Sequence, residues 1–98
     1  MAKRNILLST EILPEVEKDL KSVVEKNKDL VIHNDDFNTF DFVIDTLVEV
    51  CGHDTVQAEQ CTMIIHYCGK CAVKTDWKDE LYPMYKELLS RGLTAEIA

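Results

Sequence analysis

The sequence predicts an α+β fold with the element order βααβαβ, in which a small three-stranded antiparallel sheet packs with three helices. Its 98 residues fit one domain with a small core. Short runs with the alternation of strands are interspersed with segments whose apolar residues recur at helical spacing. Asp, Asn and Gly stand at the boundaries of these segments, where helix caps and stops belong. In so short a chain, this mixture favours one sheet covered by helices.

Residues 1–27 are predicted to form a mobile or partly helical extension that precedes a domain of residues 28–98. Residues 1–12 show no clear period, whereas a thin apolar stripe predicts a short helix over 14–26, with Pro14 in its first turn.

The sequence also favours the cytoplasm. The block Ile6–Leu8 is too short for the apolar region of a signal peptide, and no run approaches the roughly 20 apolar residues of a membrane span. We therefore expect the four cysteines to be reduced thiols.

The first strand is predicted at Leu30–His33, and the clearest helix of the chain follows it. Asn38, with Asp41 three residues later, is close to a capping box, and Gly52 ends the helix. The apolar positions of this helix are Phe40, Val43, Ile44, Leu47, Val50 and Cys51.

A second capping box, Asp54 with Gln57, predicts a helix that runs to about Tyr67 and stops at Gly69. Its apolar stripe comprises Ala58, Cys61, Ile65 and Cys68. The alternation of Lys70–Thr75 predicts the second strand.

Asp76 is a candidate cap for a third helix that ends at Gly92, before a last strand at Leu93–Ile97. Its inward residues are predicted to be Leu81, Met84, Tyr85, Leu88 and Leu89. Pro83 either kinks this helix or lies in the first turn of a shorter helix that starts near Tyr82.

The charge distribution indicates what kind of ligand the domain attracts. The net charge is −7, and no Lys or Arg occurs from Asp29 to Gly69, where eight carboxylates do. A surface without basic residues repels phosphate, so nucleic acid is excluded as a ligand class. It attracts cations, including the ammonium group of a protein N-terminus.

The polar corner Asn34–Asp36 follows the first strand and is the leading candidate binding site. Asn and Asp are common in solvated turns, and that is the alternative interpretation. As a functional set, their amide and carboxylate oxygens suit an ammonium ligand. His66, near the end of the second helix and at the edge of its apolar stripe, is a candidate second wall of that site.

The sequence does not favour two other chemistries, a zinc site and an enzyme. A zinc site would use the pair Cys68 and Cys71 with Cys51, Cys61, His53 or His66, but no second pair with ligand spacing accompanies that CxxC. An enzyme would use Asp35 or Asp36 with His66 as general acid and base, but the chain has no nucleophile elbow, phosphate loop or HExxH. We expect a protein that is not an enzyme and that holds no cofactor or metal.

The stretch LVIHNDDFNTFDFVIDTLVEV, followed by QCTMIIHYCGK, resembles the ClpS family, the adaptors of the Clp protease in the bacterial N-end rule. The resemblance is good over residues 28–75 and looser beyond. It implies a small adaptor that binds proteins by a bulky N-terminal Phe, Tyr, Trp or Leu, an N-degron. Such an adaptor hands its substrates to the N-terminal domain of a Clp-family AAA+ unfoldase, with no nucleic acid or membrane as partner.

The same resemblance implies the site residues. Asn34, Asp36 and His66 would bind the substrate's α-amino group, with Asp35 adding charge. The pocket for the first side chain would be lined by Ile32, Phe40, Val43, Thr62, Ile65 and Leu93. Phe40 and Thr62 stand where the family usually has Met, and the third helix diverges. An alternative is therefore a modulator that binds the unfoldase without recognising N-degrons.

Overall fold

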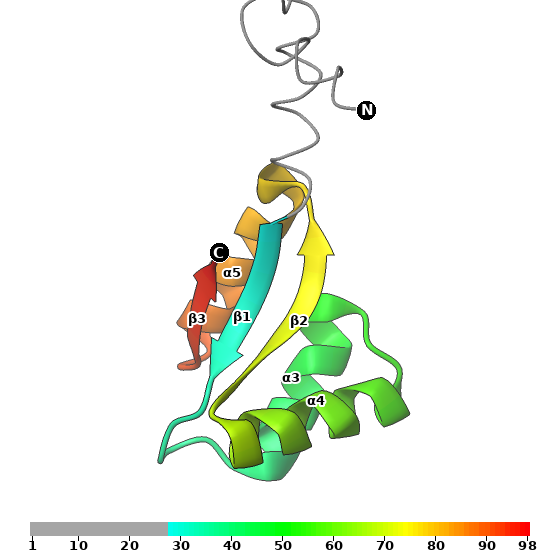
Figure 1. Cartoon of the computed structure of the whole chain (residues 1–98), viewed down its shortest axis with the longest axis vertical. Helices are drawn as coiled ribbons and strands as arrows, with labels where there is room; N and C mark the ends of the chain where they lie inside the picture. Colours follow the sequence, from blue (N-terminus) through cyan, green and yellow to red (C-terminus); the bar gives the residue numbers. More distant parts are fainter. Residues whose placement is uncertain (1–27) are drawn as a thin grey trace, which may run out of the picture.

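The protein is described by a computed structural model over residues 28–98, which confirms the predicted α+β class (Figure 1). Its elements are β1 (Lys28–His33), α3 (Phe40–Cys51), α4 (Thr55–Cys68), β2 (Lys70–Asp76), α5 (Lys78–Ser90) and β3 (Thr94–Ile97). The predicted extension and its helix over 14–26 lie outside the described residues.

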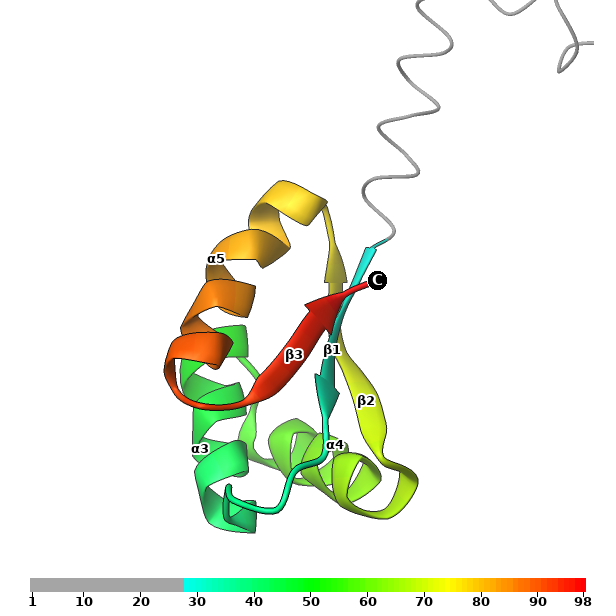
Figure 2. The same cartoon turned by 90° about the vertical axis from the view of Figure 1, so that its left-hand side faces the viewer.

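The sheet has the strand order β2-β1-β3, and both pairs are antiparallel, as predicted. Figure 2 shows α3 and α5 on the same side of this sheet, while α4 packs against α3 and β2. The first strand starts at Lys28, two residues earlier than predicted, because Lys28 and Asp29 pair with the end of β2. Asp29 also exchanges backbone hydrogen bonds of 2.9 and 2.8 Å with Ala98.

The core lies between the central strand and the three helices. Its apolar members are Leu30, Ile32, Val43, Leu47, Cys51, Ala58, Ile65, Val73, Leu81, Leu88 and Leu93. Two inward predictions are wrong, because Cys68 and Leu89 are exposed. Leu89 follows the fully buried Leu88, and neighbouring positions on a helix point about 100° apart, so only one of them faces the core.

Two of the three helix caps differ from prediction. The cap of α3 is Thr39 and not Asn38, and its hydroxyl accepts a 3.1 Å bond from the Phe42 N–H. Asp54 caps α4 as predicted. The cap of α5 is Trp77 and not Asp76, whose carboxylate accepts from the Trp77 N–H instead.

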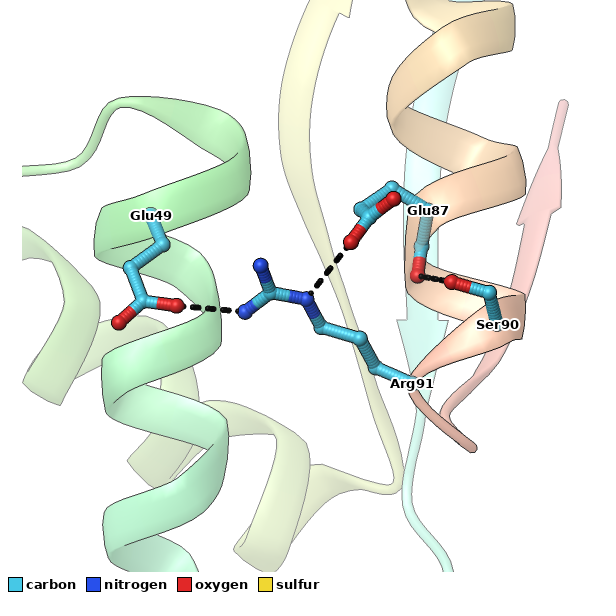
Figure 3. A network of polar contacts seen from close by, with 4 residues as sticks. All are labelled: Glu49, Glu87, Ser90 and Arg91. Atoms are coloured by element: carbon cyan, nitrogen blue, oxygen red, sulfur yellow. Dashed lines mark hydrogen bonds and ion pairs between the residues drawn. The ribbon is translucent and has the colours of Figure 1, made fainter.

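Pro83 lies inside α5, which begins five residues before it at Lys78, so the shorter helix considered for this region is wrong. At the other end of α5, the Arg91 guanidinium donates to Glu87 of α5 at 3.0 Å and to Glu49 of α3 at 2.6 Å (Figure 3). The Ser90 hydroxyl donates to the Glu87 carbonyl beside it. Arg91 therefore ties α5 to α3 next to the turn that leads into β3.

A bulge in β2 supplies the hydrogen-bond partner of a buried histidine. Leu30 pairs with Lys74 while Val31 pairs with Ala72, so Val73 is the extra residue. The Val73 carbonyl accepts a 2.7 Å hydrogen bond from Nε2 of His53, whose side chain is buried. His53 thus provides the hydrogen-bond donor for the bulged strand. Its Nδ1 atom has no partner in the described part of the chain.

We expect His53→Leu to lower the free energy of unfolding by about 1–3 kcal/mol, because it leaves the Val73 carbonyl buried without a donor. Urea denaturation followed by circular dichroism measures this change.

Thr46→Val is the matched control. The Thr46 hydroxyl is fully buried and has no hydrogen-bond partner among residues 28–98, so its loss should leave the stability unchanged or raise it. Equal destabilisation by the two substitutions would contradict the role of the His53 hydrogen bond.

Candidate functional site

A hollow of about 330 Å³ opens where β1 and α4 end, and we call it the polar hollow. It is lined by Asn34, Asp35, Asp36, Asn38, Phe40, Val43, Thr62, Ile65 and His66. A second hollow of about 20 Å³ shares five of these residues and adds His33 and the two core residues Ile32 and Leu93. The structure therefore brings together all ten residues predicted for the site, although their roles in binding stay predictions.

The two walls of the polar hollow are joined by a backbone hydrogen bond. The Asn34 N–H donates to the Gly69 carbonyl at 2.9 Å, which continues the pairing of β1 with β2 beyond His33. Gly69 is the C-cap of α4, with φ at 96°, a left-handed conformation that glycine adopts without steric cost. The loop after β1 is thus held beside the last turn of α4, which carries His66.

The Asp35 carboxylate accepts hydrogen bonds from its own loop. One carboxylate oxygen accepts from the N–H groups of Phe37 and Asn38 at 2.9 and 2.8 Å. The other accepts from the Asn38 amide at 2.8 Å. Burial raises the pKa of Asp35, but these hydrogen bonds outweigh it and hold that pKa below its ordinary value. The ionised side chain organises the loop and adds negative charge to the hollow.

Three polar side chains of the hollow are free to bind a ligand. Within residues 28–98, the side chains of Asn34, Asp36 and His66 are exposed and make no hydrogen bond. The His66 ring stands edge-on to two aromatic rings, Phe40 at 6.3 Å and Tyr67 at 4.9 Å between centroids. Phe40 thus contacts the imidazole edge-on and lines the hollow together with Val43, Thr62 and Ile65.

Asn38 is the residue of the polar hollow that the sequence did not predict, because its position before a helix marked it as a cap. Besides holding Asp35, its amide donates to the Gly92 carbonyl at 3.0 Å. Gly92 has φ at 88° and precedes Leu93, which lines the second hollow. Asn38 therefore connects the acidic loop to the turn between α5 and β3. The only signal in the sequence for this role of Asn38 was that it is a second amide side chain, four residues after Asn34.

The cysteines lie apart from the polar hollow. All four are free thiols, and burial raises the pKa of Cys51 and of Cys71 to about 11. In residues 28–98, no group of three or more His, Cys, Asp or Glu side chains is placed to hold a metal ion. None of the described helices is long and apolar enough to cross a membrane.

We expect Asn38→Ala to raise the pKa of Asp35, because the carboxylate loses the donor of its second oxygen while its burial remains. In the folded protein the pKa lies below the roughly 3.9 of an unfolded Asp, so the ionised form stabilises the fold at neutral pH. That contribution is lost as the pH falls through the folded-state pKa. An NMR titration of the Asp35 carboxyl carbon measures the change.

Asn34→Ala is the control for this titration, since the Asn34 side chain does not contact Asp35 by a hydrogen bond. An Asp35 pKa that is the same in both variants and the unmodified protein would contradict the role given to Asn38.

Comparison with known proteins gives a consistent result. The family of the ATP-dependent Clp protease adaptor protein ClpS matches residues 18–96. The ClpS adapter protein of Serratia proteamaculans is 35% identical over 78 residues, which are 76% of this chain and 73% of that protein. The one from Erwinia tasmaniensis is 40% identical over 48 residues, 47% of this chain and only 45% of the relative.

The fold has a solved counterpart in ClpS2 of Agrobacterium tumefaciens, whose structure contains bound L-phenylalaninamide. The TM-score is 0.71 at 21% sequence identity, and the match covers 76% of this chain and 96% of that one. Given the family match over most of its length, this chain belongs to the ClpS family of Clp protease adaptors.

Proposed function

We propose that this adaptor binds proteins whose N-terminal residue is a bulky Phe, Tyr, Trp or Leu and delivers them to a Clp-family AAA+ unfoldase. The observation that carries the proposal is the composition of the polar hollow. Asn34, Asp36 and His66 supply free polar groups at its rim, and apolar side chains lie directly beside them. A free α-ammonium next to an apolar side chain is the chemistry that such a site recognises.

The charge of the hollow supports this ligand. Asp35 and Asp36 both line it, and Asp35 is held ionised by its hydrogen bonds. An acetylated N-terminus has no charge to pair with these carboxylates, and an internal peptide has none either. Both would leave the polar rim unpaired, which is how the site would reject them.

Two further observations support the proposal. The Agrobacterium ClpS2 binds L-phenylalaninamide, which has the free amine and the aromatic side chain that this site would read. The domain itself is an adaptor and not an enzyme, so its role is to present substrates to a partner. We propose the N-terminal domain of the unfoldase as that partner and the cytoplasm as the compartment, in which free thiols persist.

We expect a peptide that begins with Phe to bind and its N-acetylated copy to bind at least tenfold more weakly, because the acetyl group removes the charge that the acidic rim pairs with. Fluorescence anisotropy with a dye at the peptide C-terminus measures both affinities.

Equal affinity of the two peptides would contradict N-degron recognition. Binding to an unfoldase N-terminal domain with no affinity for either peptide would favour the alternative, a modulator that has lost the recognition of N-termini.

Substitutions at the rim should weaken the binding of the Phe peptide without unfolding the domain. We expect Asp36→Asn and His66→Ala each to cost about 1–3 kcal/mol of binding free energy, because each removes one partner of a charged amine. Asp45→Asn is the matched control, since Asp45 is an exposed carboxylate of α3 that lines neither the polar hollow nor the second hollow beside it. An equal loss in Asp36→Asn and Asp45→Asn would indicate only an effect of net charge.

A further inference from the structure

We infer that a groove between α3 and α4 binds the residues that follow the N-terminal residue of a substrate, and that it selects substrates with apolar side chains there. This inference rests on the proposed function. The groove has a volume of about 610 Å³, larger than the polar hollow. Its lining consists of Phe40, Asp41, Ile44, Val56, Glu59, Gln60, Met63 and Ile64.

The groove exposes apolar side chains of α4. The exposed fractions of Val56, Met63 and Ile64 are 62%, 51% and 44%. Single exposed apolar residues are common on proteins, whereas ligand sites are typically concave and lined mostly by apolar side chains, as this groove is. None of these three residues belongs to the predicted N-terminus site.

Phe40 joins the groove to the polar hollow, since it lines both. A chain whose first side chain occupies the polar hollow would therefore enter the groove by passing over this one ring. Val56 and Met63 are seven residues apart on α4, so the groove runs for about 10 Å along the helix. An extended chain advances about 3.3–3.6 Å per residue, and the groove thus holds about three residues. Allowing one residue to cross Phe40, these are residues three to five of the substrate.

The charge of the groove restricts its occupant further. Asp41 and Glu59 are among its lining residues, and neither α3 nor α4 contains Lys or Arg. An occupant with carboxylates would be repelled, whereas an apolar segment with neutral or basic neighbours would be accepted. The groove would therefore favour N-terminal segments that are apolar and free of acidic residues, as in unfolded or newly cleaved chains.

The test compares the peptides Phe-Ser-Leu-Leu-Leu-Ser-Lys and Phe-Ser-Ser-Ser-Ser-Ser-Lys, both labelled on the C-terminal Lys, by fluorescence anisotropy. We expect the Leu peptide to bind about three- to tenfold more tightly. In the double variant Val56→Ser and Met63→Ser, this ratio should fall to near one while the affinity of the Ser peptide stays unchanged. Leu89→Ser is the matched control, because Leu89 is 43% exposed on α5 and lines neither the groove nor the polar hollow.

A ratio of one in the unmodified protein, or a ratio kept in the double variant, overturns the inference. Either result would leave the proposed function intact as long as acetylation of the Ser peptide still abolishes its binding. Failure of both peptides to bind would contradict the proposed function, and this inference with it. A dimer that the double variant dissociates, together with a ratio of one, would assign the groove to a second copy of the chain.

Discussion

The site depends on how Asp35 is held. This carboxylate accepts three hydrogen bonds from Phe37 and Asn38, and Asn38 also bonds to the Gly92 carbonyl. The loop after β1 is thereby fastened to the turn before β3, although 54 residues separate Asn38 from Gly92. Because Asp35 accepts the hydrogen bonds of the loop's own donors, the side chains of Asp36 and Asn34 are not needed for this and stay exposed. One acidic residue organises the loop, and its neighbour Asp36 lines the hollow with an exposed carboxylate.

The rest of the fold holds the surfaces around that loop. Arg91 ties α5 to α3 through Glu87 and Glu49, next to the turn that Asn38 contacts. The bond from the Asn34 N–H to Gly69 places the end of α4 beside the loop. These links join α5 to α3 and the end of β1 to α4, so the hollow is built by the tertiary arrangement and not by one motif. This placement also sets Phe40 between the polar hollow and the apolar groove.

The elements themselves could be predicted well from the sequence, since each follows from a local signal. The spacing of apolar residues predicted α3, and the Asp54 box predicted the start of α4. The errors occurred where one side chain had two possible partners. Asn38 has the chemistry of a cap, but Asp35 and Gly92 are nearer partners in the folded loop, so Thr39 caps α3 instead. Leu88 and Leu89 are equally apolar, and only packing against the sheet decided which one is buried.

By itself the sequence determined the α+β class and the acidic, lysine-free character of residues 29–69, which are properties of composition and of local spacing and need no knowledge of contacts. The residues of the candidate site were predicted by the resemblance to the ClpS family, with the polar corner Asn34–Asp36 and His66 also indicated by their chemistry. Only the tertiary structure decided that Asp35 is bound by its own loop, that Asn38 belongs to the site, and that a groove continues from Phe40 along α4. The physical reason is that each of these depends on which groups meet across the fold. Hydrogen bonds and apolar contacts between distant segments leave no periodic signal in the chain.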